Sequence, residues 1–263
     1  MDLGLKGLRA LVTGSSRGLG YATAKKLLLE GAIVTINSRS KENLDKAVKS
    51  LSNLATGKVC SIEADLLIAG APEKVVSNAA EQMGGLDILI TNAGGPPAGA
   101  FESFDEDTWE KAVNLSFLSH VRLIRSALPH LRKSDHASVL TITSYSVKQP
   151  IPNLVLSNSI RAATVGLTKS LALELGNEGI RFNSILPAWT ETERVHELMS
   201  HRANLSGRSV EEEIKLQSQS SPLGRMASPE EFANATVFMS SPAASYITGV
   251  MLSVDGGMYK GVL

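Results

Sequence analysis

The sequence has few of the residues that would commit it to a disulfide-rich, metal-binding or membrane-bound state. It contains a single cysteine, Cys60, so no internal disulfide can form, and no cluster of Cys, His and carboxylate residues has zinc-ligand spacing. No apolar run approaches the ~18 residues of a membrane span, and the amino terminus lacks the basic start and apolar stretch of a signal peptide. We therefore expect a cytoplasmic protein with no metal site and no membrane contact.

An excess of charge of either sign is also absent. The 263 residues include 26 Lys and Arg and 26 Asp and Glu, so the net charge is zero. A neutral chain has no global field to attract nucleic acid or an anionic membrane, and we expect neither as a partner. A hydrophobic fraction of 43% with 20% charged residues is ordinary for a globular protein, and the length suits one α/β domain with a large core.

Seven short apolar runs rich in β-forming residues alternate with longer segments of helical periodicity. Several runs are apolar at nearly every position, which is typical of strands covered by helices on both faces. The alternation predicts an α/β fold with a doubly wound, mostly parallel seven-stranded sheet and helices on both faces, a single Rossmann domain over residues 1–263. The expected strands are 10–13, 33–36, 59–64, 86–91, 139–142, 181–186 and 250–254, and the clearest helices are 18–30 and 162–175.

One segment departs from this alternation. Residues 191–219 are polar and charged, and they lie between the sixth expected strand and Pro222. The segment is either a solvated pair of helices or a lid over a substrate site. Its position after a strand end favours the lid.

A glycine-rich turn follows the first expected strand. Residues 13–20 read TGSSRGLG, with the spacing Gly-x3-Gly-x-Gly rather than the commoner Gly-x-Gly-x-x-Gly. Glycine permits a tight turn and close approach of a ligand, and the positive end of the following helix attracts a pyrophosphate. Such turns also join strands to helices without a ligand, but the strand-turn-helix context favours a dinucleotide. Residues 92–95, read NAGG, follow the fourth strand and either leave space for a ribose and ring or form a loop with unusual dihedrals.

These motifs make the sequence similar to the short-chain dehydrogenase/reductase (SDR) family, and within it to the 3-oxoacyl-[acyl-carrier-protein] reductase and glucose dehydrogenase-like group. The resemblance covers nearly the whole chain. It implies one NAD(P)-binding Rossmann domain, a small-molecule carbonyl or alcohol substrate, and a homotetramer or homodimer. The matching segments are Thr13-Gly14-x3-Gly18-x-Gly20, Asn92-Ala93-Gly94, Pro187, Ser221-Pro222-Leu223-Gly224-Arg225, Pro229-Glu230-Glu231, Tyr246-Ile247-Thr248-Gly249 and Asp255-Gly256-Gly257.

The residues that end the second strand indicate which nicotinamide cofactor binds. NAD enzymes of this family usually have an Asp there, which bonds the ribose hydroxyls and repels a 2'-phosphate, whereas this chain has Asn37, Ser38 and Arg39. Arg17 and Arg39 could converge on the 2'-phosphate, or both could simply face solvent. We expect NADP rather than NAD.

The resemblance also assigns further cofactor contacts. Asp65 resembles the family's adenine-contacting Asp, although a helix N-cap or a turn would explain an Asp there equally. The full set of expected cofactor-binding residues is Gly14, Ser16, Arg17, Gly18, Leu19, Gly20, Ser38, Arg39, Asp65, Leu66, Asn92, Ala93, Gly94, Arg161, Pro187 and Thr192.

The catalytic positions depart from the family. SDR reductases use Asn, Ser, Tyr and Lys; Asn114 and Ser144 match, but the Tyr and Lys positions hold Ser157 and Arg161. Serine is too weak an acid to replace a phenol whose unperturbed pKa near 10 is lowered by the adjacent Lys. Arg161 stays charged and cannot relay protons, though its guanidinium could bond the cofactor's ribose or capture a substrate carboxylate.

Tyr145 is the first candidate for the missing proton donor. Strand alternation would direct its ring away from Ser144 unless the loop turns there, and packing in a core or an interface is the alternative. Lys148, His196 and His201 are weaker candidates, because a histidine on a lid is more often just solvated.

We therefore predict an NADP-dependent SDR oxidoreductase with an atypical active site, interconverting a carbonyl and a secondary alcohol. The alternative is a protein that retains NADP but has lost its chemistry, as a redox sensor or a non-catalytic subunit. Joint retention of Asn114, Ser144 and a cation at position 161 favours the enzyme. The family resemblance places the long helices near residues 109–131 and 162–175 at one oligomer interface and the carboxy-terminal strand at another.

Overall fold

A seven-stranded parallel sheet organises the molecule. The computed structural model describes residues 1–54 and 57–262. The strand order is β3-β2-β1-β4-β5-β6-β7, with every neighbouring pair parallel, and it reverses between β1 and β4. This is the doubly wound topology that the alternating pattern predicts. The strands are β1 (Arg9–Val12), β2 (Ile33–Ser38), β3 (Val59–Glu63), β4 (Ile88–Thr91), β5 (Ser138–Ile142), β6 (Arg181–Pro187) and β7 (Met251–Val254).

All seven expected strands are confirmed to within two residues at each end. Their apolar runs follow from burial on both faces, since every residue of β4 and of β5 is buried. The outermost strand β7 is only half-buried along its length. The other outer strand, β3, is also partly exposed, so the sheet has a covered centre and two partly accessible edges.

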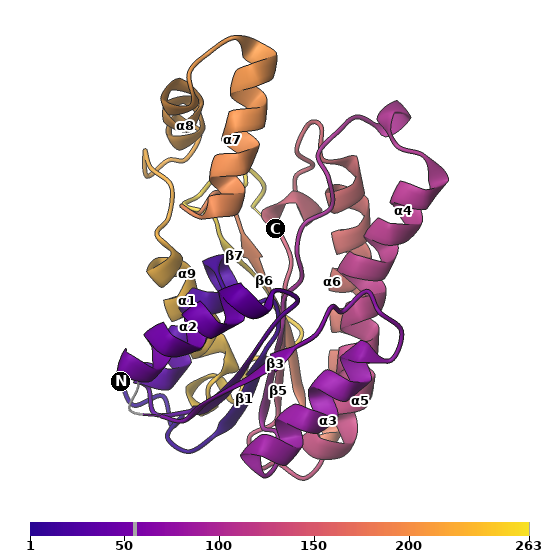
Figure 1. Cartoon of the computed structure of the whole chain (residues 1–263), viewed down its shortest axis with the longest axis vertical. Coiled ribbons are helices and arrows are strands. Elements are labelled where there is room, and N and C mark those ends of the chain that lie inside the picture. The colour runs from indigo at the N-terminus through magenta and orange to yellow at the C-terminus, as the bar shows by residue number, and fades with distance from the viewer. Residues whose placement is uncertain (55–56, 263) are drawn as a thin grey trace.

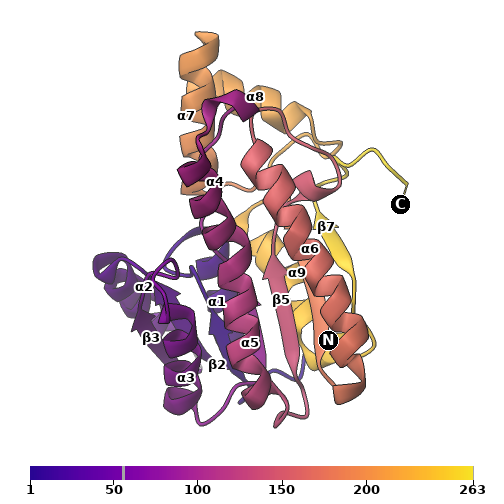
Figure 2. The same cartoon turned by 90° about the vertical axis from the view of Figure 1, so that its right-hand side faces the viewer.

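Helices cover the sheet on both faces (Figures 1 and 2). On one face, Leu27 and Phe232 belong to a core cluster with the inner strands, and on the other face Leu123 and Phe182 belong to a second cluster. Leu167, Leu171 and Leu175 recur every four residues in the expected helix 162–175, and all three pack against this second cluster. The first face carries α1 (Gly18–Leu29), α2 (Lys41–Leu54) and α9 (Pro229–Ser240), and the second carries α3 (Ala71–Met83), α5 (Ser119–Leu131) and α6 (Val155–Leu175).

The segment before α5 contains a π-helical turn. Helix α4 (Glu106–Val113) continues into α5 through the turn at Asn114–Leu118. The Ser116 carbonyl in this turn accepts a hydrogen bond from Thr164 Oγ1 of α6, at 2.9 Å. The Asn114 side chain forms a hydrogen bond within the same segment, in which its Nδ2 donates to the Glu110 carbonyl at 3.0 Å. π-Helical turns are frequent at functional sites, and this one begins at the predicted catalytic residue Asn114.

The polar segment expected at residues 191–219 forms two helices, α7 (Glu193–Ser206) and α8 (Val210–Gln219), which stand apart from the layers at one end of the molecule (Figure 1). Thr192 caps α7 by accepting from the Val195 N–H. Met199 of α7 is fully buried in a third apolar cluster with Leu186 of β6. No helix in the described part of the chain has the length and apolar character needed to cross a membrane.

Candidate functional site

An open cleft lies at the carboxyl ends of the central strands, where the strand order reverses. The cavity has a volume of ≈ 420 Å³, within the range of roughly 300–1,000 Å³ that small-molecule sites occupy. Ligands of open parallel sheets bind in this crevice. The residues predicted from the sequence that line the cleft are Gly14, Arg17, Gly18, Leu19, Arg39, Asn92, Ala93, Gly94, Ser144, Tyr145, Ser157, Arg161, Pro187 and Thr192.

The turn between β1 and α1 presents backbone N–H groups to the cleft. Gly14 and Gly18 have φ values of 55° and 59°, in the left-handed region that favours glycine. A Cβ at Gly14 would stand 2.8 Å from the Asn92 carbonyl oxygen, and Asn92 Nδ2 donates to the Gly14 carbonyl at 2.9 Å. The N-cap residue Arg17 makes no side-chain cap bond, so the first N–H groups of α1 remain available to an anion.

The end of β2 presents a cation and no carboxylate to the cleft. Asn37 is buried, and its Nδ2 donates to two carbonyls at the end of β3, at 3.1 and 3.2 Å. Ser16 Oγ donates to Ser38 Oγ at 2.9 Å, which joins the glycine turn to the strand end. Arg39 lines the cleft and makes no hydrogen bond or ion pair within the described residues. This cation is free to meet an anionic ligand.

The Arg17 side chain, unlike that of Arg39, forms ion pairs with other residues of the protein. Its Nη1 lies 2.7 Å from Glu193 Oε2 and 3.9 Å from Glu197 Oε1, both on α7. All three side chains are more than half exposed, so the pairing is weak. The two arginines thus both line the cleft, but one of them is held by α7.

Six predicted residues lie outside the cleft lining. Gly20 packs α1 against the turn, because a Cβ there would stand 2.5 Å from the Gly14 carbonyl oxygen. Asp65 Oδ1 accepts from the Leu67 N–H at 3.0 Å, the turn geometry that was the alternative to adenine contact. Leu66 is buried in the second core cluster. The six are Ser16, Gly20, Ser38, Asp65, Leu66 and Asn114.

Arg161 sits at the floor of the cleft with only 8% of its surface exposed. Its Nη1 donates to the carbonyls of Ile142 and Thr143, at 3.3 and 3.2 Å, beyond the end of β5. Its Nε donates to Ser157 Oγ, one turn earlier on α6, at 3.2 Å. Burial, assisted by the charge of Arg194, lowers the pKa of Arg161 to about 10, so it remains a cation at neutral pH.

Ser144 and Tyr145 lie at the start of a short 3-10 turn, η3 (Tyr145–Val147). Ser144 Oγ accepts from the Ser146 N–H at 3.1 Å. The turn brings Tyr145 to the same cleft as Ser144, but as a buried residue of the third apolar cluster together with Trp189. Burial raises the pKa of Tyr145, which makes its phenol a weaker acid than a free tyrosine.

A buried histidine stands behind the cleft. His120 of α5 is 1% exposed, and its Nδ1 lies 2.6 Å from Thr91 Oγ1 at the end of β4. Its Nε2 has no hydrogen-bond partner among the described residues. Desolvation, with the nearby charge of Arg161, lowers the pKa of His120 to about 3, so the ring is neutral at physiological pH.

The weaker proton-donor candidates do not line the cleft. Lys148 Nζ lies 5.2 Å from the centroid of the Tyr259 ring. His196 and His201 are exposed residues of α7 and are not part of the cleft lining. Within the described residues, Ser144, Tyr145, Ser157 and Arg161 are the only predicted catalytic candidates that share the cleft.

Arg194 and Trp189 are among the residues of the cleft wall that sequence reasoning missed. Arg194, in the first turn of α7, donates from Nη2 to the Pro96 carbonyl at 3.0 Å. Trp189 is 7% exposed, and the guanidinium carbon of Arg202 lies 4.8 Å from its ring centroid. An arginine in a first helical turn opposes the helix dipole, and this mismatch could have singled out Arg194.

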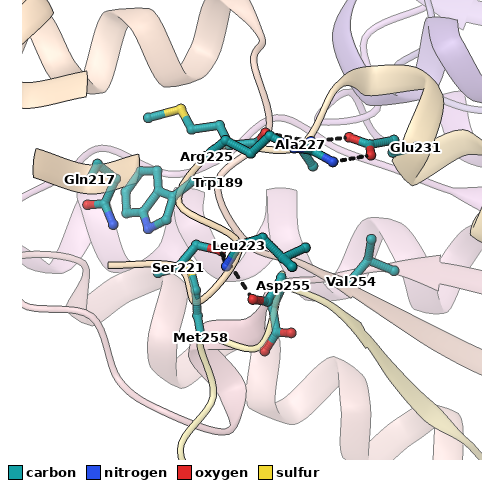
Figure 3. Close-up of a pocket in the computed structure, with 12 residues that line it drawn as sticks. Trp189, Gln217, Ser221, Leu223, Arg225, Ala227, Glu231, Val254, Asp255 and Met258 are labelled. Atoms are coloured by element: carbon teal, nitrogen blue, oxygen red, sulfur yellow. Dashed lines mark hydrogen bonds and ion pairs between the residues drawn. The ribbon is translucent and has the colours of Figure 1, made fainter. Parts of the chain in front are cut away.

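Trp189 also lines a smaller cavity of ≈ 120 Å³ (Figure 3). Arg225 and Glu231 on its rim form a two-pronged ion pair, with both contacts at 2.7 Å. Ser221 Oγ donates to the Gly256 carbonyl at 3.1 Å. Arg225 and Glu231 neutralise each other, and the Ser221 hydrogen bond joins residues 221–225 to the loop that follows β7.

Known proteins are similar to this chain in sequence and in fold. Residues 14–259 match the family model described as Enoyl-(Acyl carrier protein) reductase. Dehydrogenase/reductase SDR family member 4 of Bos taurus is 34% identical over 252 residues, which cover 94% of this chain and 86% of that protein. The structure of L-sorbose reductase from Gluconobacter frateurii with NADPH and L-sorbose has a TM-score of 0.95 and 30% identity, covering 100% of both chains.

A variant of actinorhodin polyketide ketoreductase, solved with NADPH, is a further similar structure. Its TM-score is 0.90 at 27% identity, with 96% of this chain and 97% of that chain covered. The TM-scores show that both structures share the fold of this chain. The chain therefore belongs to the short-chain dehydrogenase/reductase family and is an SDR-type oxidoreductase.

Proposed function

We propose that this protein is an NADP-dependent oxidoreductase that interconverts a small-molecule carbonyl and a secondary alcohol by hydride transfer. The observation that carries the proposal is the shared cleft, in which the glycine turn of α1 and the hydroxyls of Ser144 and Ser157 line one space. Similar structures bound to NADPH support a nicotinamide cofactor at this place. A small carbonyl beside the hydroxyls would then lie next to the hydride.

The residues present fit an NADP molecule. Gly14 and Gly18 have left-handed backbone, and the N-terminus of α1 has no side-chain cap, so its N–H groups suit a pyrophosphate. A Cβ at Gly14 would clash with the Asn92 carbonyl oxygen and disturb this turn. Arg39 would hold the 2'-phosphate, because it faces the cleft without a partner among the described residues. A Cβ added at Gly94 would meet no atom of the described residues within 4 Å, which leaves open space beside β4 for the ribose and ring. When bound, the cofactor supplies or accepts the hydride.

The two serines would hold the reacting oxygen. Ser157 Oγ accepts from Arg161 and Ser144 Oγ accepts from the Ser146 N–H. Each hydroxyl already uses its oxygen as an acceptor, so its own hydrogen is free to be donated to a carbonyl or alkoxide oxygen. Donors fixed before the reaction stabilise the negative charge that hydride transfer places on this oxygen.

Arg161 would stabilise that charge without supplying the proton. Its pKa of about 10 and its contacts with two backbone carbonyls keep it protonated and fixed. The alkoxide would take its proton from water, since the serine hydroxyls are too weak as acids and burial raises the pKa of Tyr145. Absence of a general acid costs roughly 10²- to 10⁴-fold in rate. We expect slow but real turnover.

The remaining predicted features belong to the same proposal. Helices α7 and α8 would act as a substrate lid, because Thr192, Glu193 and Arg194 at the start of α7 line the cleft. The alternative function is a non-catalytic NADP-binding protein. The raised pKa of Tyr145 favours it, since this phenol in the cleft is a poor acid.

The cofactor preference tests the proposal directly. Titration of NADPH and NADH by fluorescence should give tighter binding of NADPH by about ten-fold or more, because the 2'-phosphate gains a charge-assisted bond. Arg39→Gln should remove most of this preference and leave NADH binding unchanged. Arg208→Gln, on the loop between α7 and α8 and paired with Glu213, is the matched control. Equal binding of both cofactors by the unaltered protein would contradict the charge argument.

Turnover separates the two functions. NADPH-bound protein should oxidise its cofactor in the presence of reactive carbonyls, followed by the loss of absorbance of the reduced nicotinamide. Tight NADPH binding with no turnover on any carbonyl would favour the non-catalytic alternative.

A further inference from the structure

Two arginines border one point of the cleft. The point is the position that a Cβ at Gly95 would occupy: Arg194 Nη2 and Nε lie 3.6 and 3.7 Å from it, and Arg161 Nη2 lies 4.0 Å from it. Arg161 comes from α6 and Arg194 from α7, so the cleft floor and the proposed lid each contribute one cation. The two positive charges repel each other, and an anion bound between them would offset this repulsion.

The charge of Arg161 has no counterpart among the described residues. Its Nη1 and Nε are satisfied by two backbone carbonyls and by Ser157, which are neutral acceptors. Its Nη2 makes no hydrogen bond or ion pair within residues 1–54 and 57–262, and this is the nitrogen that faces the Gly95 position. Burying an unpaired cation is costly, so a site that keeps one is suited to an anionic ligand.

Arg194 is only loosely neutralised. Its Nη2 donates to the Pro96 carbonyl at 3.0 Å, and its Nη1 lies 3.4 Å from Glu197 Oε2. Glu197 also lines the cleft, but its side chain is about half exposed, and an ion pair so exposed contributes little. The Arg194 fork therefore remains available to a stronger, less hydrated partner.

The arginine pair is separate from the groups suited to the phosphates of a dinucleotide. Those groups are the N-terminus of α1 and Arg39, which belong to the β1 and β2 side of the cleft. Arg161 instead bonds the end of β5 and Ser157, and Arg194 bonds the Pro96 carbonyl in the loop after β4. An anion held here would sit beside the hydroxyls proposed to hold the reacting oxygen.

We propose that Arg161 and Arg194 form an anion subsite that selects carbonyl substrates carrying a carboxylate. Arg161 offers its unpaired Nη2, and Arg194 offers Nε and Nη2 as one edge of its planar guanidinium, so the pair can bond both oxygens of a carboxylate. The carboxylate would lie between α6 and α7 while the carbonyl oxygen meets Ser144 and Ser157. Arginine at position 161 then serves substrate recognition, and the lid helix α7 closes on the charge of the substrate. This inference rests on the proposed function.

Paired acids and esters test the subsite. The probes are 2-oxobutanoate, acetoacetate and 4-oxopentanoate, each compared with its methyl ester, which keeps the carbonyl and removes the charge. Binding is measured by thermal melting of the full chain, with and without saturating NADPH. At least one acid should bind about ten-fold more tightly than its ester, as expected for charge-assisted hydrogen bonds.

Variants assign that preference to Arg194. Arg194→Gln should bring acid and ester to within about three-fold of each other, whereas Arg194→Lys, which keeps the charge but loses the fork, should retain part of the preference. Arg208→Gln changes the same charge beside α7 outside the cleft and should leave the preference intact.

The outcomes keep the two proposals distinct. NADPH binding with equal affinity for acid and ester in all three pairs would overturn the subsite and leave the proposed function standing. An acid preference that survives Arg194→Gln would also overturn it. An acid preference without any binding of NADPH would support the subsite and contradict the proposed function.

Discussion

The buried histidine behind the cleft links the stability of the fold to pH. His120 is neutral in the folded chain because its ring is buried, contacts Thr91 and lies near the cationic Arg161. In the unfolded chain its pKa returns to about 6.5. Between the two values the unfolded chain binds more protons than the folded chain, so stability rises with pH through this window and is lost as the pH falls.

Removing the His120 ring should flatten this dependence. With a folded pKa of about 3, lowering the pH from 7 to 5 costs the native state about 2 kcal/mol through this group alone. His120→Asn keeps a polar partner for Thr91 and should lose about 2 kcal/mol less than the unaltered protein over that step, measured by urea unfolding at both pH values. His136→Asn, at an exposed histidine, should behave like the unaltered protein. Equal slopes for all three proteins would show that His120 does not titrate on unfolding.

Single residues also show what sequence can predict of the site. Gly14, Gly18 and Arg39 were expected in the cleft because a turn, a helix end and a missing carboxylate are local features. The partners of Arg17 were not expected, since Arg17 and Glu193 are 176 positions apart in the chain. Side-chain directions across such gaps depend on how the helices pack, which no local pattern encodes.

At the scale of elements, the strands were easier to predict than the helix that carries the site. Burial on both faces gives β4 and β5 continuous apolar runs, and these stand out in the sequence. Helix α6 was expected from residue 162 but begins at Val155. Its first turns carry Ser157 and Arg161 toward the cleft, and these polar residues interrupt the apolar periodicity. The polar residues that line the cleft therefore hid the start of α6 from a prediction based on apolar periodicity.

Helix α7 is tied to the glycine turn through exposed charges, and this link bears on cofactor binding. Arg17 pairs with Glu193 at 2.7 Å beside the proposed phosphate site. A 2'-phosphate must compete with the Glu193 carboxylate for Arg17 and also lies in its repulsive field. This arrangement of α7 therefore opposes NADP more than NAD.

Glu193→Gln should accordingly tighten NADPH binding a few-fold at low salt and leave NADH binding unchanged. The gain should fade as ionic strength rises, because all the charges involved are exposed. Fluorescence titration at two salt concentrations measures both effects. Glu211→Gln, at an exposed acid of α8, is the control with the same change of charge. Weaker NADPH binding by Glu193→Gln would mean that the ion pair positions Arg17 for the phosphate.

On the scale of the whole molecule, one edge of the sheet is poorly covered. The edge strand β7 is half-buried along its length, and Tyr246 before it is fully exposed. Leu173, on the outer face of α6, is 76% exposed. Helix α6 contacts the same loop, since Lys169 Nζ donates to the Gly249 carbonyl at 3.2 Å. An exposed strand edge flanked by large apolar side chains is a surface that soluble proteins normally cover.

A second copy of the chain is the occupant that we expect on this surface. A two-fold axis beside β7 would place the α6 and β7 regions of two copies against each other, as closed symmetry requires. Light scattering at micromolar concentration should then give a multiple of the 27.9 kDa chain mass, a dimer or a tetramer. Leu173→Glu would bring like charges together across the axis and should lower that mass, with the fold confirmed by circular dichroism. Leu216→Glu, on the exposed face of α8, should leave the mass unchanged. A mass near 27.9 kDa for the unaltered protein would exclude this assembly, and a lower mass for both variants would place the interface elsewhere.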